Sequence, residues 1–336
     1  MTLKNNISLK PFNTFGIDVN ASKFVSIDSL QNLKDILNTN PVDLLILGGG
    51  SNLLLTKDVE ALVLQINLKG ISVISSFKNS VHVEVAAGEN WHELVCWCLN
   101  KDFGGLENLS LIPGNVGTAP IQNIGAYGVE LKDSFISCKA IHIHTKELRT
   151  FTKEECNFGY RNSVFKQELK GQYIITSVVF ELSRYDHSLK TNYGAIEAEL
   201  QNSAIETPTI QDVSKAVISI RNSKLPDPKI IGNSGSFFKN PVISYSKFEV
   251  LQNQFPQIQH YKISENAVKI PAGWLIDTAG FKGKTFGDFG VHTKQALVLV
   301  NYGGASGKDI LNLSQQIQKA VKYIFDIDLE TEVNIL

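Results

Sequence analysis

The sequence predicts an α+β protein of about two domains, and three observations support this class. The chain has 336 residues, and roughly 150 residues per domain is usual. Helix-like and strand-like segments are mixed from end to end, without the regular alternation of parallel α/β folds. The segment Leu225–Pro226–Asp227–Pro228 breaks a helical pattern, because proline lacks a backbone donor and disfavours helix at the preceding residue. We therefore expect a domain boundary near residue 222.

The first part of the chain contains two predicted helices and two predicted strands. Ser29 can cap a helix over residues 30–37, whose apolar residues recur every three or four positions. Residues 44–47 are a short apolar run that three glycines stop, which is typical of a buried strand entering a tight turn. Residues 81–85 alternate valine with polar residues, as in a half-buried strand. Asn90 can then cap an amphipathic helix.

The second part continues the same mixture. Residues 174–180 are rich in β-branched types and predict a strand. Thr209 and Asp212 flank the start of another helix. Ser306 begins a last long helix with apolar residues on one face, and a short strand is expected over residues 333–335. No internal repeat or low-complexity tract is present.

Composition and charge exclude several classes of function. The 32 Lys+Arg and 33 Asp+Glu give a formal net charge of −1, whereas a nucleic-acid binder needs a basic surface and an anionic membrane attracts polybasic segments. No apolar run approaches the ~18 residues of a membrane span, and residues 1–6 lack an apolar signal core. Four scattered cysteines form no disulfide framework. We expect a cytoplasmic protein that binds neither nucleic acid nor membrane.

Two fragments imitate known sites without completing them. Residues 48–53 follow a strand, but Leu53 stands where the dinucleotide fingerprint G-x-G-x-x-G requires its last glycine. His142 and His144 would share one face of a strand and start a metal site. No third ligand is evident, so an exposed strand face is the favoured interpretation and we predict no metal.

Four segments instead carry the residue types of a ligand site. In Gly48–Asn52, glycines let backbone amides approach an anion closely, although a plain tight turn explains this segment equally well. Residues 111–128 hold four glycines, two prolines and no charge. Such a segment suits a rigid backbone around a large planar or phosphorylated ligand, with a merely structural loop as the alternative. Residues 159–163 and 221–241 gather cations, amides and hydroxyls in Gly/Pro-rich connections, which favours an anionic ligand.

Together these segments resemble the UDP-N-acetylenolpyruvoylglucosamine reductase family. The resemblance begins at residues 10–16, includes the four segments above, and continues through residues 272–277 and 291–298 to residues 329–333. It thus covers essentially the whole chain, and it includes the tyrosine of the family's longer subtype. It implies an FAD enzyme with NADPH as co-substrate. That enzyme reduces UDP-N-acetylenolpyruvoylglucosamine to UDP-N-acetylmuramate for peptidoglycan synthesis, and so serves cell-wall biogenesis, cell shape and cell division.

The resemblance also implies the fold and its division. We expect a two-subdomain FAD-binding fold of the vanillyl-alcohol-oxidase (PCMH) type, followed by a C-terminal α+β substrate domain. Residues 1–67, completed by 326–336, would form the first FAD-binding subdomain. Residues 68–221 would form the second, and residues 222–325 the substrate-binding domain. We expect a monomer.

The family pattern assigns roles to particular residues. Arg161, Ser236 and Glu332 match the three catalytic positions. The residues expected to bind FAD are Gly48, Gly49, Gly50, Ser51, Asn52, Pro113, Gly114, Gly117, Thr118, Ile121, Gln122, Asn123, Gly125, Ala126, Tyr127, Gly128 and Arg161. Those expected to bind the UDP-sugar are Tyr193, Arg221, Lys224, Asn240 and Gln295. FAD should be bound non-covalently, because the two FAD loops contain neither His nor Cys.

Two residues depart from the family pattern. Ala119 stands where a small hydroxyl residue is expected, and Asn334 occupies an often-basic position.

The resemblance also implies a mechanism, and two alternative functions stay open. Hydride reaches carbon 3 of the enolpyruvyl group, negative charge develops at carbon 2, and Ser236 would deliver a proton there. Arg161 suits the substrate carboxylate, and Glu332 would be protonated or held by Lys224 or Arg161. A flavin oxidase on the same fold and a nucleotide-sugar binding protein without chemistry are the alternatives.

Overall fold

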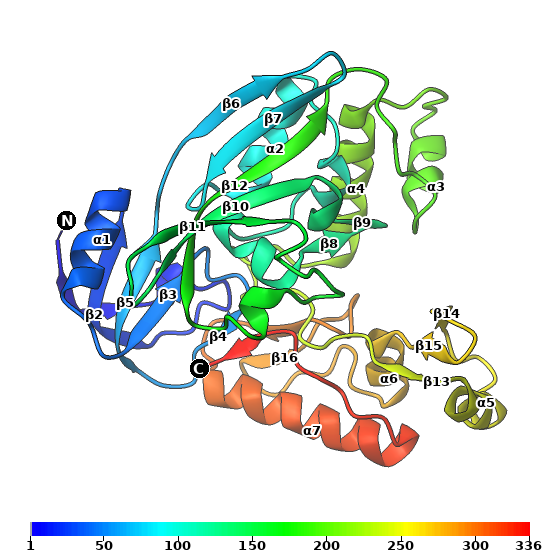
Figure 1. Cartoon of the computed structure of the whole chain (residues 1–336). Coiled ribbons are helices and arrows are strands. Elements are labelled where there is room, and N and C mark those ends of the chain that lie inside the picture. The colour runs from blue at the N-terminus through cyan, green and yellow to red at the C-terminus, as the bar shows by residue number, and fades with distance from the viewer. Residues whose placement is uncertain (1) are drawn as a thin grey trace. The chain divides into compact units, whose positions relative to one another are not determined.

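The computed structural model describes residues 2–336, which divide into two compact units (Figure 1). The first unit contains residues up to Ile7, residues 21–49 and residues 59–223. The second unit contains residues 8–20, 50–58 and 224–336. The three-part division expected from the sequence stays a prediction. Within residues 2–336, no helix has the length and apolar character needed to cross a membrane.

A four-stranded sheet begins the first unit. Its strands, in the order in which they pair, are β1 (Lys4–Ser8), β2 (Asn20–Ile27), β5 (Val59–Ile66) and β3 (Leu44–Leu47). Both β2 and β3 run parallel to β5. Helix α1 (Leu30–Asn38) packs Leu33 and Leu37 into the core of this sheet. The Ser29 hydroxyl caps the helix by accepting the Asn32 amide at 3.2 Å, as predicted.

A five-stranded antiparallel sheet forms the larger part of the first unit. Its strands, in order, are β11 (Leu148–Thr152), β10 (Phe135–His142), β12 (Tyr173–Ser183), β7 (Ser80–Ala86) and β6 (Ile71–Ser76). The alternating valines of β7 are fully buried. Helix α2 (Trp91–Asn100) covers that face, and its Leu94 and Val95 join the same core (Figure 1). The period-two pattern therefore identified the core face correctly.

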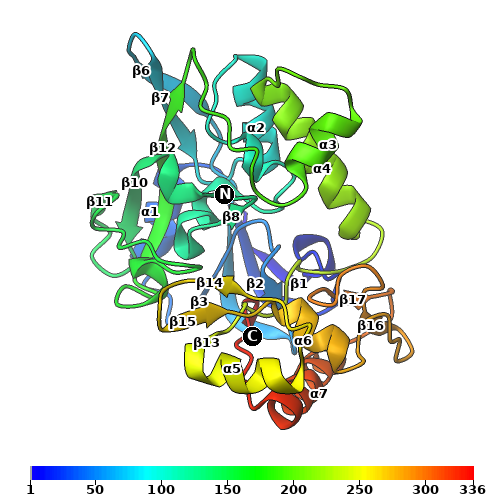
Figure 2. The ribbon, with the colours of Figure 1, turned by 90° about the vertical axis from the view of Figure 1, so that its right-hand side faces the viewer.

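The first unit is completed by two further helices and short elements. Helix α4 (Ile210–Lys224) begins where Thr209 and Asp212 bond each other's backbone amides, and it ends just before Leu225–Pro226. Helix α3 (Ile196–Asn202) packs with α4 in a small apolar core (Figure 2). A two-stranded ribbon joins β8 (Gly125–Ala126) and β9 (Val129–Glu130). The 3₁₀ turns here are Glu107–Leu109, Val116–Thr118, Pro120–Gln122, Leu131–Asp133 and Val164–Lys166.

The second unit has short strands and three helices. The strands are β4 (Leu53–Leu54), β13 (Val242–Ser244), β14 (Tyr261–Lys262), β15 (Ala267–Lys269), β16 (Phe289–Val291), β17 (Leu299–Asn301) and β18 (Asn334–Ile335). The helices are α5 (Tyr245–Gln254), α6 (Ala272–Thr278) and α7 (Gly307–Phe325), and a 3₁₀ turn spans Lys10–Phe12. Ser306 and Asp309 form a reciprocal capping box at the start of α7. The C-terminal strand β18 pairs in parallel with β4.

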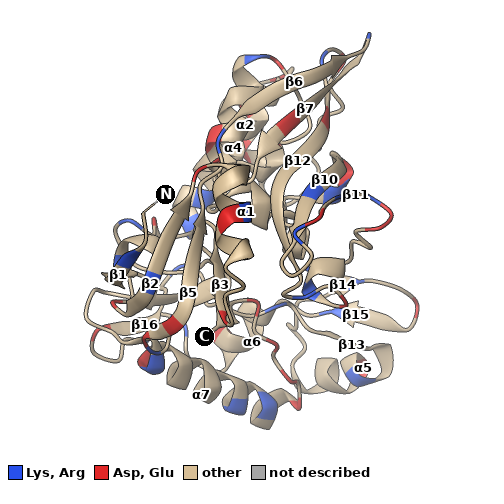
Figure 3. Ribbon diagram, turned by 60° about the vertical axis from the view of Figure 1, so that its left-hand side comes forward, with Lys and Arg blue, Asp and Glu red and all other residues tan. Residues whose placement is uncertain are grey.

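Acidic and basic residues are intermingled over both units (Figure 3). Lysines of α7, for example, stand among aspartates, and Lys322 contacts both Asp326 and Asp328. This distribution matches the nearly balanced charge of the sequence.

Candidate active site

Two of the glycine-rich loops meet in the first unit. Gly48 and Gly49 follow β3, and they lie against the segment that runs from Gly114 to Thr118. A methyl group placed on Gly49 would stand 2.8 Å from Gly114 Cα, and one on Gly48 would stand 2.5 Å from Thr118 Cγ2. Only glycine permits so close an approach of two backbones. The structure thus joins two of the segments that the sequence singled out separately.

The next turn of the first loop belongs to the second unit. Gly50 has a φ of +61° and packs tightly against the backbone at Phe12. Its carbonyl accepts the Thr14 amide at 3.1 Å. Ser51 and Asn52 continue the turn into β4 and are half-buried. The close contact with Phe12 and Thr14 explains why residues 10–16 belong with the functional segments.

The second half of the long uncharged loop is fixed by Asn123. This residue is fully buried and has a φ of +46°. Its amide nitrogen donates to the Gly159 carbonyl at 3.0 Å, and its amide oxygen accepts the Lys132 backbone amide at 3.1 Å. The Ser163 hydroxyl donates to the Ile121 carbonyl at 2.6 Å. The third predicted cluster, residues 159–163, therefore lies directly against the loop.

Arg161 is held in an unusual conformation beside this loop. Its φ is +52°, in the left-handed region that residues with a Cβ seldom adopt. Its Nη2 donates to the Gly125 carbonyl at 2.7 Å, and a methyl on Gly125 would lie 3.0 Å from Nη1. Strained backbone of this kind is frequent at functional sites. The guanidinium is thereby fixed at the Gly125–Ala126 end of the loop.

The end of the loop contacts the predicted substrate residue Tyr193 and interacts electrostatically with Arg221. Tyr193 is 52% exposed, and its Cβ would lie 3.0 Å from a methyl placed on Gly128. Tyr127 packs on the α3–α4 core, and burial raises the pKa of its phenol. Arg221, on α4, is half-buried, and its buried Nε has no hydrogen-bond partner among residues 2–336. Burial lowers the pKa of Arg221, and the neighbouring Tyr127 opposes that shift.

The second unit brings Ser236 and Glu332 close together. Ser236 is half-buried, follows Gly235 with its φ of +68°, and pairs with Val298 in an isolated antiparallel bridge. The Glu332 amide donates to the Phe237 carbonyl at 2.8 Å. Two of the three predicted catalytic residues thus lie on adjacent antiparallel segments, although they are far apart in sequence.

The first FAD loop is also tied to the glutamate. The Asn52 side-chain nitrogen donates to the Glu332 carbonyl at 3.2 Å. Asn334 donates to the Asn52 carbonyl from its side chain at 2.9 Å and from its backbone at 3.2 Å. Asn334, the departure from an often-basic position, therefore has a structural function in fixing this turn. Ala119, the other departure, is 2% exposed and packs in the core.

Two predicted substrate residues meet at the start of α6. The Asn240 side chain accepts the Ala272 amide at 2.9 Å. The Gln295 Oε1 would lie 3.1 Å from a methyl on Gly273. Lys224 is the last residue of α4 and begins the C-terminal segment of the second unit, and its side chain is exposed.

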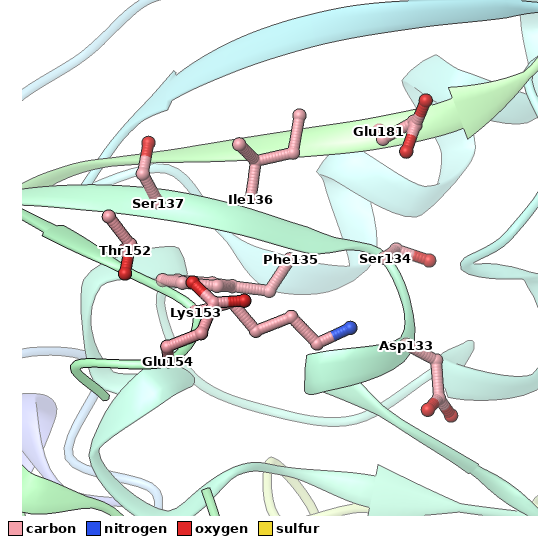
Figure 4. Close-up of a pocket in the computed structure, with 9 residues that line it drawn as sticks. All are labelled: Asp133, Ser134, Phe135, Ile136, Ser137, Thr152, Lys153, Glu154 and Glu181. Atoms are coloured by element: carbon pink, nitrogen blue, oxygen red, sulfur yellow. The ribbon is translucent and has the colours of Figure 1, made fainter. Parts of the chain in front are cut away.

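A separate cavity of about 420 Å³ lies on the first unit (Figure 4). It is lined by residues 133–137, 152–154 and Glu181, and it contains none of the predicted site residues. Its carboxylates, from Asp133, Glu154 and Glu181, outnumber its single lysine, Lys153. Such a lining repels phosphates, so this cavity does not suit an FAD or nucleotide-sugar ligand.

The expected strand position of His144 is wrong. Strand β10 ends at His142, and His144 lies in the turn that follows. The physical reason is local, because Nδ1 of His142 accepts the backbone amides of His144 and Thr145 and so closes the turn. Over residues 2–336, no cluster of three or more His, Cys, Asp or Glu side chains suits a metal ion.

The structure adds a residue that sequence reasoning missed. Asn108 is buried, and its side-chain nitrogen donates to the carbonyls of Tyr127 and Lys190 at 2.9 and 2.8 Å. It thereby fixes Tyr127 relative to the segment that carries Tyr193. A single buried asparagine in a 3₁₀ turn has no distinguishing pattern in the sequence, so no local signal identifies it.

Comparison with known proteins identifies the family. The family described as "UDP-N-acetylenolpyruvoylglucosamine reductase, C-terminal domain" matches residues 227–336, and the family described as "FAD binding domain" matches residues 23–148. The UDP-N-acetylenolpyruvoylglucosamine reductase of Flavobacterium johnsoniae is 57% identical, with 100% of both chains covered. The chain belongs to the UDP-N-acetylenolpyruvoylglucosamine reductase family. The Pseudomonas fluorescens (strain Pf0-1) reductase is 50% identical, with 99% of each chain covered.

A solved structure supports the fold. The UDP-N-acetylenolpyruvylglucosamine reductase of Thermus caldophilus has a TM-score of 0.70 at 23% identity, with 100% of this chain and 99% of that chain covered. The predicted fold class is therefore confirmed. The chain is an FAD-containing, NADPH-dependent oxidoreductase that reduces the enolpyruvyl group of UDP-N-acetylenolpyruvoylglucosamine in peptidoglycan precursor synthesis, as the sequence predicted.

The residues present fit FAD. Gly48, Gly49 and Gly114 leave backbone without side chains where the two loops meet. Residues 111–128 carry no charged side chain, so their backbone amides are available to neutral and anionic parts of a dinucleotide. Within these loops no His or Cys is present for a covalent link.

Proposed function

We propose that the reduction is carried out by Arg161, Ser236 and Glu332, with FAD held by residues 48–52 and 113–128. The chemistry that FAD supplies when bound is the transfer of hydride from NADPH to carbon 3 of the enolpyruvyl group. The observation that carries the proposal is the hydrogen bond from the Glu332 amide to the Phe237 carbonyl at 2.8 Å. It sets the predicted proton donor and the predicted glutamate on neighbouring segments.

Arg161 binds the carboxylate of the enolpyruvyl group. A guanidinium offers a planar fork of donors and a permanent positive charge, which match a carboxylate. The bond from Nη2 to the Gly125 carbonyl uses part of that fork and fixes its direction. As hydride arrives at carbon 3, negative charge spreads from carbon 2 into the carboxylate, and Arg161 stabilises it there.

Ser236 donates the proton to carbon 2. A serine hydroxyl is a weak acid, but the enolate is a strong base, so a strongly acidic donor is not needed. Gly235, with its φ of +68°, and the bridge from Ser236 to Val298 hold the hydroxyl in a fixed turn. Glu332 orients the carboxylate end of the substrate, and the bond from Asn52 fixes its backbone.

Five residues bind the UDP-sugar, and two of them, Tyr193 and Lys224, also bind the phosphates of NADPH. Tyr193 is exposed beside Gly128 and covers the nucleotide. Lys224 is exposed and contacts the diphosphate. Asn240 and Gln295, at the start of α6, contact neighbouring polar groups. Arg221 supplies a half-buried cation whose buried Nε has no partner among residues 2–336.

We further propose that the protein is a cytoplasmic monomer and that its product supports cell-wall biogenesis, cell shape and division. The nearly neutral net charge of −1 is consistent with a small-molecule enzyme rather than a nucleic-acid or membrane binder.

An anaerobic flavin titration tests the proposed reaction. NADPH is added to the purified protein in excess, followed by UDP-N-acetylenolpyruvoylglucosamine, and the absorbance of the oxidised flavin is recorded after each addition. Bleaching by NADPH and recovery by the enolpyruvyl substrate support the proposal. Rapid recovery with oxygen alone would indicate an oxidase, and a colourless protein would indicate a binding protein.

A further inference from the structure

Leu111, at the start of the long uncharged loop, has an unfavourable backbone conformation. Its φ is +59°, in the left-handed region where a branched side chain is uncommon. Leu111 is half-buried and is followed by Ile112 and Pro113, which lead into the predicted FAD contacts. A conformation of this kind persists only when the surrounding structure holds it.

Helix α2 provides the contacts that hold this part of the chain. The Trp91 backbone amide donates to the Gly114 carbonyl at 3.0 Å, and the Trp91 indole donates to the Leu109 carbonyl at 2.9 Å. Between these two bonds, the Leu111 amide donates to Nδ1 of His92 at 3.0 Å. Of these three bonds, only the third depends on a group that titrates near neutral pH.

The hydrogen bond fixes the state of the imidazole. Because Nδ1 accepts the Leu111 amide, this nitrogen is unprotonated and the ring proton lies on Nε2, which faces Cys96 Sγ at 3.7 Å. Partial burial and the positive charge of Arg221 on α4 lower the pKa of His92, and Glu93 on its own helix opposes this shift. The neutral imidazole is therefore the favoured form in the fold.

We propose that His92 is a positioning residue for FAD: its neutral imidazole holds the Leu111 amide and with it the start of the flavin loop, and its protonation releases that loop. The inference rests on the proposed role of residues 113–128 in binding FAD. Protonated His92 has no acceptor for the Leu111 amide and places a second cation near Arg221. Both effects disfavour the FAD-binding conformation.

The sign of the pH dependence follows from the lowered pKa. The hydrogen bond is fully formed above the ordinary histidine pKa of about 6.5 and is lost as the pH falls through the lower value of the folded protein. If His92 takes up one proton when the flavin loop is released, the FAD dissociation constant rises by up to about tenfold for each pH unit below the pKa of His92 in the folded protein. Above pH 7 this contribution is flat.

Three substitutions, two at His92 and one at Leu111, test the proposal through the affinity of the apoprotein for FAD. His92→Asn places an amide oxygen where Nδ1 stands and cannot titrate. His92→Leu removes the acceptor, and Leu111→Gly removes the cost of the positive φ. Flavin fluorescence on mixing each apoprotein with FAD gives the dissociation constant between pH 5 and pH 8.5, and hydrogen exchange of residues 109–117 reports the loop without FAD.

The expected results differ among these variants. At pH 8, His92→Asn should bind FAD within about threefold of the parent protein, while His92→Leu should bind at least about tenfold more weakly and exchange residues 109–117 faster. Adding Leu111→Gly to His92→Leu should restore most of the affinity. His92→Asn should lose the acid-side weakening that the parent shows.

Two results would overturn the proposal. One is an identical fall of FAD affinity with pH in the parent and in His92→Asn. The other is unchanged FAD affinity of His92→Leu at pH 8. Where His92→Leu fails to fold, the comparison of the parent with His92→Asn still decides. Failure of the proposed function is distinct, because then the parent protein itself would not bind FAD or would not bleach with NADPH.

Discussion

The backbone amide of Glu332 donates to the carbonyl of Phe237 at 2.8 Å, which links the C-terminal segment to the turn that carries Ser236. The neighbouring bridge between Phe238 and Thr331 extends this pairing. Phe237 and Phe238 are themselves buried, with 0% and 1% of their surface exposed. Burial of the two rings on the same segment makes the position of Ser236 a consequence of core packing.

The first prediction concerns the contact between the two FAD loops. In Gly49→Ala the new methyl group would lie 2.8 Å from Gly114 Cα. This is too close for two carbon atoms, so at least one of the two loops must shift. We expect a cost of about 1–3 kcal/mol in FAD binding, or roughly 5- to 150-fold in the dissociation constant. Fluorescence titration of the apoprotein with FAD measures it.

Gly48→Ala provides a matched comparison. Here the methyl meets only the Thr118 Cγ2, at 2.5 Å, while the next nearest atoms of Thr118 lie at 3.7 and 3.8 Å. The substitution Thr118→Ser removes that Cγ2. Combined with Gly48→Ala it should restore the affinity for FAD, whereas combined with Gly49→Ala it should leave the affinity low. Equal rescue of both variants, or no loss in either, would contradict the close approach of these loops.

Local patterns in the sequence predicted several of the elements correctly. The Ser29 cap, the Ser306–Asp309 capping box and the alternating valines of β7 are signals contained within a few residues, and each element occurs where it was expected. Such signals depend on backbone groups near in sequence. The helix that begins after Thr209 also ends where Leu225–Pro226 predicts.

The geometry of the site required long-range contacts that no local pattern contains. The pairing of Glu332 with Phe237 joins distant segments, and only the family resemblance connected Glu332 with Ser236 beforehand. The left-handed conformations of Asn123 and Arg161 likewise depend on bonds to Gly159 and Gly125. His144 shows the converse: its backbone amide and that of Thr145 donate to the His142 imidazole, which ends a strand that the residue pattern would continue.

The second prediction concerns the attachment of FAD. The two FAD loops lack His and Cys, and the exposed Cys96 lies on α2, outside both loops. Acid precipitation of the holoprotein should release all of the flavin into the supernatant, as measured by its absorbance. Yellow colour that stays with the washed precipitate would show a covalent link and contradict this prediction.

The third prediction concerns the order of substrates. The chain contains no complete dinucleotide fingerprint, so the phosphates of NADPH and of the UDP-sugar should bind in turn to the same two residues, Lys224 and Tyr193. Initial-rate plots at several fixed concentrations should give parallel lines, with inhibition by excess enolpyruvyl substrate. Lys224→Ala should raise the KM for both ligands, because the exposed ammonium would contact the phosphates of each.

Lys229→Ala is the control for Lys224→Ala. Lys229 is also exposed and lies five residues further along the same connection, but it is assigned no ligand contact. It should leave both KM values within about twofold, the usual range for a surface substitution. Intersecting initial-rate lines, or a Lys224→Ala effect on one substrate alone, would indicate two separate sites.

The fourth prediction separates the two halves of the reaction at Ser236. Reduction of the flavin by NADPH needs no proton at carbon 2 of the substrate, so Ser236→Ala should leave its rate nearly unchanged in stopped-flow absorbance. Reoxidation by the enolpyruvyl substrate should slow by ~10²- to 10⁴-fold, the usual contribution of a positioned general acid. Ser236→Cys should recover part of this rate, because a thiol also donates a proton.

Arg161→Lys is the comparison that distinguishes proton donation from charge stabilisation. Lysine keeps the positive charge but loses the planar fork and, with it, the bond that Nη2 makes to the Gly125 carbonyl. Reoxidation should again be the slower half-reaction, but Ser236→Cys should not compensate for this change.

If Ser236→Ala slows both half-reactions equally, the serine acts through folding or FAD binding. If it slows neither half-reaction by even about tenfold, the effect is smaller than that of a positioned general acid. The proton then comes from another donor, and Glu332 is the next residue to substitute.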